Sequence, residues 1–184
     1  MSVWTVRAPF PDGLRGRLGE ILIDSVEHGA SVGFLSPLHH AAADDYWRRV
    51  ERAVADGRSI LLAAESDGAV AGTVQVDVDT PPNQPHRATV CKLLVHTGAR
   101  RRGLGEELMV AAEEAAAEAG RWLLVLDTAT PAAERLYRRL GWTVAGVVPD
   151  YAMNPDSSLT QTVFYWKALA RRLPAAAPRA APRR

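Results

Sequence analysis

One stretch decides the fold: Arg100-Arg101-Arg102-Gly103-Leu104-Gly105. It follows residues 88–95, which are apolar enough for a strand, and precedes residues 104–119, where apolar side chains recur at helical spacing. The start of a helix leaves several backbone N–H groups without acceptors, and the helix dipole favours an anion there. The two glycines let a phosphate approach the backbone, and the arginines add positive charge. The stretch therefore predicts a phosphate-binding turn, although any α/β protein could contain a basic strand-to-helix turn.

Other phosphate-binding and hydrolase motifs do not fit the sequence. The glycines are not followed by Lys-Ser or Lys-Thr, so there is no Walker loop, and the third glycine of the dinucleotide fingerprint is missing. Residues 29–33 read Gly-Ala-Ser-Val-Gly, as in a hydrolase nucleophile elbow, but a predicted helix precedes them where a strand is required. A hydrolase triad of this type has the chain order Ser, Asp, His. No histidine follows His96, so Asp127 cannot belong to such a triad.

The remaining segments give the chain a regular succession of strands and helices. Hydrophobic periodicity and the positions of Gly and Pro predict the order βααβββαβαββ. Strands are expected at 4–8, 59–65, 70–78, 88–95, 122–126, 142–148 and 160–168, and helices at 12–29, 36–57, 104–119 and 130–141. Residues 1–170 would then form one α/β domain. Residues 171–184 are rich in Ala, Pro and Arg without apolar periodicity, and we expect them to be a disordered tail.

Length and composition are those of one ordinary globular domain. The chain has 184 residues, of which 47% are hydrophobic and 23% charged, and its formal net charge is +1. This charge gives no global reason to expect nucleic acid or an anionic membrane as a partner. No stretch reaches the ~20 apolar residues that span a bilayer. Cys91 is the only cysteine, and the first seven residues lack the apolar run of a signal peptide, so we expect a cytoplasmic protein.

Together with its neighbours, the basic turn resembles the Arg/Gln-x-x-Gly-x-Gly/Ala motif of the GNAT superfamily of N-acetyltransferases. Three flanking segments match the same superfamily in order and spacing: Lys92-Leu-Leu-Val-His96, Leu126-Asp-Thr128 and Ala133-Glu-Arg-Leu-Tyr-Arg-Arg-Leu-Gly-Trp142. Further segments are similar to the branch that contains tabtoxin-resistance proteins, which acetylate a small antibiotic. These segments are residues 29–35, 46–47, 86–88, 149–151 and 155–159.

The resemblance implies a single domain with a mixed, mostly antiparallel seven-stranded sheet and about four helices. Two parallel central strands, 88–95 and 122–126, are expected to splay apart at their C-terminal ends. The pantetheine arm of acetyl-CoA would lie in that gap like an added strand, bonded to the backbone of Leu93, Leu94 and Val95. An amide near Val95 would bind the thioester oxygen. The pyrophosphate would meet the turn and the start of the helix, at Arg100, Arg101, Arg102, Gly103, Leu104, Gly105 and Glu106.

Acetylation of an amine needs a general base, because an amine with a pKa of about 10 is protonated at neutral pH. Asp127 is the candidate, since a carboxylate that closes an apolar strand beside the gap is hard to explain by packing. The structural alternative is that Asp127 and Thr128 cap the next helix. The sequence departs from the tabtoxin-resistance branch at Thr89, where that branch often has glutamate. Either Asp127 suffices, or the substrate and the base are arranged differently.

The departing thiolate needs a proton, and Tyr137 matches the tyrosine that holds the thiol sulfur in the superfamily. The alternative is a core tyrosine on an amphipathic helix. For the acceptor pocket the candidates are Phe34, Trp47, His86 and Tyr151, each of which by itself could equally belong to the core or the surface. The histidines at 39 and 40 do not have metal-ligand spacing, and no metal is expected.

These features predict direct acetyl transfer from acetyl-CoA to an amine of a small molecule, such as an antibiotic or toxin, without a metal or an acyl-enzyme. Two alternatives stay open. The acceptor could be a protein N-terminus or a lysine, or the domain could bind acetyl-CoA without catalysis and regulate a partner. Neither nucleic acid nor a membrane is expected as a partner. We expect a monomer or, because exposed sheet edges in this fold often pair, a homodimer.

Overall fold

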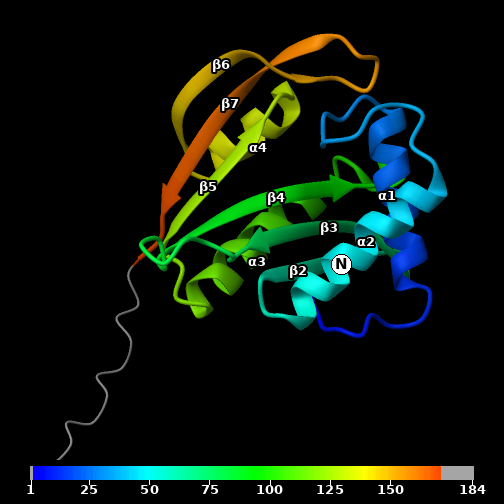
Figure 1. Ribbon diagram of the computed structural model, residues 1–184, viewed down its shortest axis with the longest axis horizontal. Helices are drawn as coiled ribbons and strands as arrows, with labels where there is room; N and C mark the ends of the chain where they lie inside the picture. The colour runs from blue at the N-terminus through cyan, green and yellow to red at the C-terminus, as the bar shows by residue number, and fades with distance from the viewer. Residues whose placement is uncertain (1, 171–184) are drawn as a thin grey trace, which may run out of the picture.

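The computed structural model describes residues 2–170, so the predicted tail at 171–184 lies outside the described residues. The elements follow the predicted order, with one additional turn of 3-10 helix, η1, after the fourth strand (Figure 1). No helix within residues 2–170 is long and apolar enough to cross a membrane. The elements are β1 (Ser2–Val6), α1 (Leu14–Glu27), α2 (His40–Ala55), β2 (Ser59–Ser66), β3 (Ala69–Asp77), β4 (Arg87–Val95), η1 (Thr97–Ala99), α3 (Leu104–Glu118), β5 (Leu123–Thr128), α4 (Pro131–Arg139), β6 (Thr143–Met153) and β7 (Leu159–Ala168).

All seven strands form one sheet in the order β1-β2-β3-β4-β5-β7-β6. Only β4 and β5 pair in parallel, and every other neighbouring pair is antiparallel. The crossover between the two parallel strands contains α3, because parallel neighbours cannot be joined by a tight turn. The predicted fold class, a mixed and mostly antiparallel seven-stranded sheet with four helices, is confirmed.

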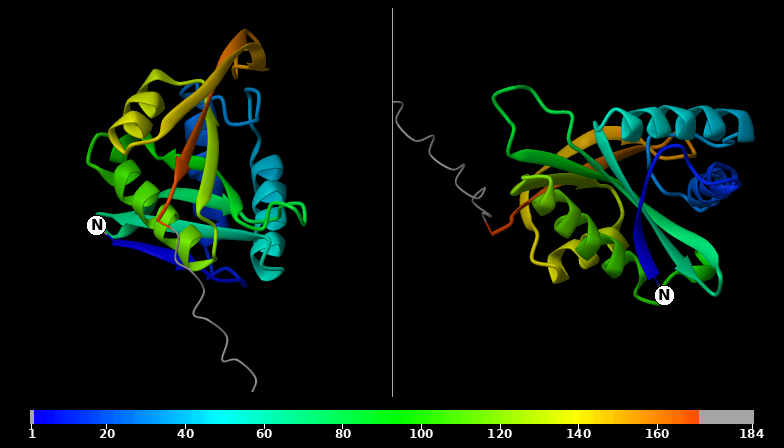
Figure 2. Two further views of the ribbon diagram at one scale, coloured as in Figure 1. Left: turned by 90° about the vertical axis from the view of Figure 1, so that its left-hand side faces the viewer. Right: turned by 90° about the horizontal axis from the view of Figure 1, so that it is seen from below.

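The helices cover the two faces of the sheet, and the alternation of side chains along the strands explains how (Figure 2). In β2, Leu62 and Ala64 belong to a core cluster that includes the apolar face of α3. Leu61 and Ala63 belong to a second cluster that includes α1 and α2. Successive side chains of a strand point to opposite faces, so a single apolar strand supplies both cores.

The parallel strands β4 and β5 separate soon after they begin. They pair over three residues of each strand only, ending at Thr89 and Val125, while β5 continues to pair with β7 up to Thr128. On the other edge of β4 the register with β3 slips, and Lys92 lies at the slip with a φ of 52°. Such a bulge bends a strand and increases its twist. The expected splay is therefore present, with the second half of β4 unpaired on the side facing β5.

Several element bounds differ from the sequence-based expectation by one to five residues, among them two helix starts and one strand end. The first helix begins at Leu14 rather than at residue 12, and its N-cap is Gly13 in a left-handed conformation without a side-chain cap. The second begins at His40 rather than at residue 36, because the amide of Ser36 donates instead to the carbonyl oxygen of Pro155 at 3.0 Å. The sixth strand extends to Met153, five residues beyond the expected end.

Candidate active site

The basic turn carries a row of backbone N–H groups that no described residue accepts. None of the amides from Arg101 to Gly105 has an acceptor within residues 2–170. Arg101 (φ 61°) and Gly103 (φ 88°) are both left-handed, a conformation that turns successive amides toward one side and forms an anion-binding concavity. The amide of Glu106, by contrast, already donates to the carbonyl oxygen of Gly103 at 2.9 Å. The amide of Glu106 thus closes the first helical turn, while the residue still lines the groove described next, and its predicted contact with the cofactor stays a prediction.

The three arginines of the turn have different surroundings. The Nε of Arg100 donates to the carbonyl oxygen of Val95 at 3.0 Å. The Arg102 guanidinium pairs with Asp67 in the β2–β3 turn and does not line the groove described next, so the predicted contact of Arg102 with the pyrophosphate can come only from its backbone amide. Arg101 lines that groove and forms no ion pair with any residue from 2 to 170. Within this turn, the positive charge that faces the groove therefore comes from Arg100 and Arg101.

A groove of about 480 Å³ runs from this turn along β4 to α4, and we call it the β4–α4 groove. Leu93, Leu94 and Val95 line it from the edge of β4 that has lost its strand partner. On the opposite wall, α4 contributes Arg135, a cation that the sequence analysis did not single out. Its signal lay in the basic composition of the segment around Tyr137. The groove thus combines a free strand edge with a cationic, amide-rich end.

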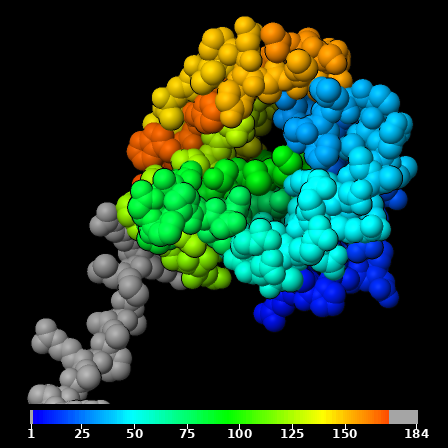
Figure 3. Space-filling model, viewed as in Figure 1, coloured from blue at the N-terminus to red at the C-terminus, as the bar shows by residue number. Residues whose placement is uncertain are grey.

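A second cavity of about 300 Å³ continues from the β4–α4 groove, and we call it the Asp127 cavity (Figure 3). In Figure 3 it appears as a hollow between β4, the segment joining α1 to α2, and the β6–β7 strands. The two spaces share four lining residues, so a long ligand could extend from one into the other. The shared residues are Ala30, Leu93, Thr130 and Ala133.

Asp127 lies on the wall of this cavity without a hydrogen bond to any described residue. Partial burial raises the pKa of its carboxyl, and the nearby positive charge of Lys92 offsets part of that rise. Of the capping alternative only the part of Thr128 is observed, because the amide of Thr130 at the start of α4 bonds to Thr128 Oγ1 at 3.2 Å while Asp127 makes no such bond. A carboxylate with a raised pKa, open to a cavity, suits a general base.

Tyr137 faces the same cavity from α4, and only 6% of the residue is exposed. Its ring packs between Trp142 and Tyr165, at centroid distances of 6.1 and 5.8 Å. Its hydroxyl group makes no hydrogen bond within the described part of the chain. Burial, followed by the negative charge of Asp127, raises the pKa of the phenol far above its usual range. The hydroxyl therefore stays protonated at physiological pH and is available as a donor.

The sequence pattern of the acetyltransferase (GNAT) family matches residues 23–142, which contain the basic turn, both splayed strands and α4. The chain belongs to the GNAT family. A curated relative, described as an uncharacterized N-acetyltransferase in the hisH-hisA intergenic region of Azospirillum brasilense, is 33% identical over 106 residues. The match covers 56% of this chain and 61% of the relative, so the chain spans less than two thirds of that protein's length.

Solved structures share the GNAT fold over nearly all of the chain. Salmonella typhimurium yncA, solved with its cofactor acetyl-CoA, is 18% identical with a TM-score of 0.75, covering 96% of this chain and 99% of its own. Phosphinothricin acetyltransferase from Sinorhizobium meliloti in complex with acetyl-CoA is 19% identical, with a TM-score of 0.73 and coverages of 92% and 89%. A ribosomal-protein-alanine N-acetyltransferase from Brucella melitensis is 20% identical, with a TM-score of 0.76 and coverages of 92% and 100%. At these identities the likeness shows the fold alone.

The four residues predicted for the acceptor pocket of this GNAT domain do not come together. Tyr151 of β6 lines the Asp127 cavity. Phe34 lies just outside it, packed edge-on against Tyr46 at 5.3 Å. We correct the other two. Trp47 is fully buried in the core between α1, α2 and the sheet. His86 precedes β4, stacked on Trp122 at 4.7 Å, at the opposite end of β4 from the splay.

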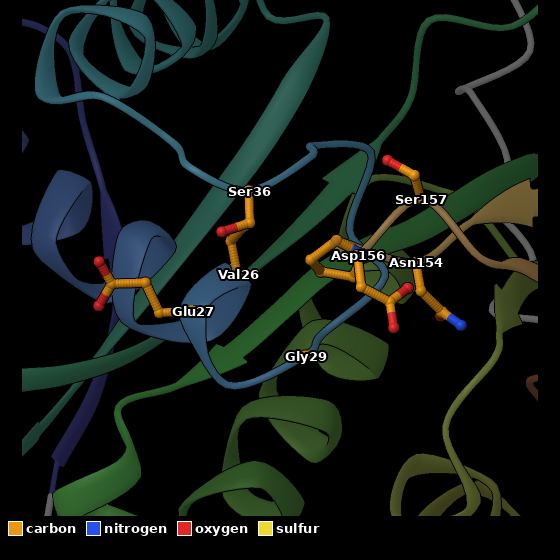
Figure 4. A pocket seen from close by; sticks show the side chains of 8 residues that line it. Val26, Glu27, Gly29, Ser36, Asn154, Asp156 and Ser157 are labelled. Carbon is orange, nitrogen blue, oxygen red and sulfur yellow. The ribbon is translucent and has the colours of Figure 1, made fainter.

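The segment between α1 and α2 is fastened to the β6–β7 turn and roofs the Asp127 cavity. Besides the bond from Ser36 to Pro155, Ser31 Oγ donates to the carbonyl oxygen of Met153 at 3.3 Å. A third, open cavity of about 550 Å³ lies beside these contacts, lined by the end of α1 and the β6–β7 turn (Figure 4). It contains neither Asp127 nor Tyr137. Within residues 2–170, no group of His, Cys, Asp or Glu side chains is placed to hold a metal ion.

Proposed function

We propose that this GNAT protein transfers the acetyl group of acetyl-CoA directly to an amine of a small molecule. One observation carries the proposal: the β4–α4 groove, with its row of unaccepted amides, opens into the cavity that contains Asp127 and Tyr137. The amides from Arg101 to Gly105 and the Arg101 guanidinium would hold the pyrophosphate. The unpaired edge of β4 would hold the pantetheine arm by strand-like hydrogen bonds. The thioester would then lie where groove and cavity meet.

The proposed chemistry uses Asp127 and Tyr137 in successive steps. Asp127 removes the proton that an ammonium group must lose before its nitrogen can attack the acetyl carbon. The C–N bond forms as the C–S bond breaks, and Tyr137 donates its proton to the departing sulfur. The second proton lost by the acetylated nitrogen returns to the Tyr137 oxygen, directly or through water. Cys91 does not serve as a nucleophile in this scheme, because burial raises the pKa of its thiol to about 11.

The size of the Asp127 cavity and its roof favour a small acceptor over a polypeptide. The cavity is about 300 Å³, and the fastened segment between α1 and α2 lies over it. Phosphinothricin, the compound named for the Sinorhizobium meliloti relative, belongs in the panel of amines to be tested, together with other amine-bearing antibiotics. A single cysteine and no disulfide suit the reducing cytoplasm that we propose as its location.

The test is release of free thiol from acetyl-CoA in the presence and absence of each amine in a mixed panel. The proposal expects thiol release that depends on a small amine, with the acetylated product identified by mass spectrometry. Faster acetylation of peptide N-termini or lysines would favour the polypeptide alternative. Tight acetyl-CoA binding without amine-dependent release from any acceptor would favour a regulatory binding domain.

A further inference from the structure

Lys92 is a cation inside the Asp127 cavity that the proposed chemistry does not use. It is one of only two lysines in the chain, and it occupies the bulge of β4 in a left-handed conformation with a φ of 52°. Left-handed backbone is uncommon for a residue with a side chain, and it persists only where the surrounding structure imposes it. Lys92 lies on the wall of the cavity, between Cys91 and Leu93.

The ammonium group of Lys92 has no partner within residues 2–170. It makes no hydrogen bond there, and no ion pair within 4.0 Å joins it to a carboxylate. It lies close to the segment that roofs the cavity, because a Cβ placed on Gly33 would be 3.6 Å from Nζ. The absence of a side chain at Gly33 therefore leaves space beside the charge. Lys92 is a partly buried residue, and an anion in the adjacent space would give its ammonium group a charge-assisted hydrogen bond.

The cavity also holds a negative charge that Lys92 does not neutralise. Asp127 feels the charge of Lys92, but the two groups do not form an ion pair. The other titratable groups on the wall are the phenols of Tyr137 and Tyr151 and the thiol of Cys91, none of them a carboxylate. The wall of the cavity thus carries a carboxylate and an ammonium group that are not paired with each other, so the carboxylate can receive an ammonium group and the ammonium group can receive an acid.

We propose that Lys92 binds an acid group of the acceptor, so that the preferred acceptor is a small amine that also carries a carboxylate or a similar anion. This inference rests on the proposed function and adds to it a class of substrate and a specificity residue. In such a molecule the ammonium group faces Asp127 while the acid faces Lys92. A charge-assisted hydrogen bond of this kind contributes about 1.5–3 kcal/mol, which corresponds to a preference of roughly tenfold or more.

The experiment compares each proteinogenic amino acid with its own carboxamide, which keeps the amine and side chain but lacks the acid. For the wild type we expect a kcat/KM ratio of acid to amide of about tenfold or more. Lys92→Met keeps an unbranched side chain that is one atom shorter and removes its charge, so the ratio should fall close to one, mainly through a higher KM for the acid. Lys92→Arg keeps the charge and should retain a preference for the acid, which controls for loss of folding in the Met variant.

A role of Lys92 limited to tuning Asp127 predicts a different result. Lys92→Met would then leave the acid-to-amide ratio unchanged, lower kcat for both acceptors alike and move the pH–rate profile to higher pH. That outcome, or equal rates with acids and amides in the wild type, would overturn the inference. If no amine is acetylated at all, the proposed function fails. Calorimetric titration of the same acids and amides into the protein saturated with coenzyme A then decides the inference alone, and equal affinities for acid and amide would reject it.

Discussion

At the scale of single residues, Tyr137 has an unusual combination of burial and an unused hydroxyl group. If it protonates the departing thiolate, Tyr137→Phe keeps the ring and its packing but removes the donor. We expect kcat to fall about tenfold or more, with kcat/KM falling in parallel because the lost hydrogen bond acts in the transition state. Coenzyme A affinity and melting temperature should hardly change. Steady-state kinetics and thermal melting provide the measurements.

A neighbouring tyrosine supplies the matched control. The hydroxyl of Tyr165 donates to Glu134 at 3.0 Å, and its ring packs against that of Tyr137. Tyr165→Phe therefore loses a buried phenol of the same kind outside the Asp127 cavity, and we expect a modest loss of stability with kcat retained. Wild-type turnover in the Tyr137→Phe enzyme would make Tyr137 a packing residue.

Replacing Asp127 by asparagine should lower the activity of the enzyme without lowering its stability. Because burial raises the pKa of its carboxyl in the folded state, the charged form is disfavoured by folding, and this cost is present at pH values above that pKa. Asp127→Asn should lower kcat/KM by about 10²–10⁴ without lowering the melting temperature at neutral pH. In the wild type, activity should decline as the pH falls through the raised pKa, since the protonated acid cannot act as a base.

The control for Asp127 is Asp45→Asn, which removes an exposed carboxylate of α2 that pairs with Arg48. This variant should keep both activity and its pH profile, because exposed ion pairs contribute little. Normal turnover together with a lowered melting temperature in Asp127→Asn would assign the residue a purely structural role.

At the scale of elements, the turn between β4 and α3 should bind the pyrophosphate mainly through its backbone. A Cβ at Gly105 would lie 3.5 Å from Leu136 of α4, so the branches of a valine would intrude on the groove or displace its wall. In Gly105→Val we expect the rise in melting temperature caused by coenzyme A to disappear. Arg101→Ala keeps the backbone amides, so it should only reduce the rise in melting temperature that coenzyme A causes. Equal and complete loss in both variants would mean that side-chain charge dominates, and binding retained in Gly105→Val would reject the assignment.

The same turn is anchored to α1 by Asp24. Burial acts to raise the pKa of Asp24, but hydrogen bonds from the Thr97 hydroxyl and amide, at 2.7 and 2.9 Å, lower it below the usual range. A lowered pKa stabilises the fold above the ordinary pKa of an aspartate, and this stabilisation is lost as the pH falls through the folded-state value. Asp24→Asn should reduce the free energy of unfolding by about 1–3 kcal/mol at pH 7, and the deficit should shrink under acid conditions.

Denaturant unfolding at several pH values measures this effect, with Glu27→Gln as the matched control. Glu27 is exposed on the same helix and forms no ion pair with the residues from 2 to 170, so its loss should be nearly neutral. A destabilisation by Asp24→Asn that is independent of pH would show that the charge of Asp24 is not what anchors the turn.

The sequence predicted the elements and the basic turn well, because both depend on local periodicity and on glycine placement. It did not predict the bulge at Lys92, since a left-handed lysine arises from the register slip between β3 and β4. The sequence also did not distinguish the surroundings of Arg101 from those of Arg102, because Arg102 pairs with Asp67, which is 35 residues away in the chain. Trp47 was mistaken for a pocket residue, although its helical spacing with Val50 already favoured the core.

At the scale of the whole molecule, segments far apart in the chain combine to limit what can reach the Asp127 cavity. Two hydrogen bonds join the segment between α1 and α2 to the β6–β7 turn. The residues that each of them joins are more than a hundred positions apart in the sequence. Neither half of the fold would enclose the cavity alone. If the acceptor binds there, as we propose, it enters a covered space of about 300 Å³.

This enclosure predicts discrimination by size. With acetyl-CoA held constant, kcat/KM should fall by at least about tenfold from a single amino acid to a peptide of six residues that begins with the same amino acid. A dipeptide with a free N-terminus should be intermediate, because part of it must project out of the cavity. The loss should appear chiefly in KM, since a larger acceptor is hindered from entering rather than from reacting once bound. Competition between the free amino acid and the peptide, followed by mass spectrometry of both products, gives the ratio directly. A hexapeptide that competes equally would show that the roof opens readily, and the polypeptide acceptor would then become the better description of the natural substrate.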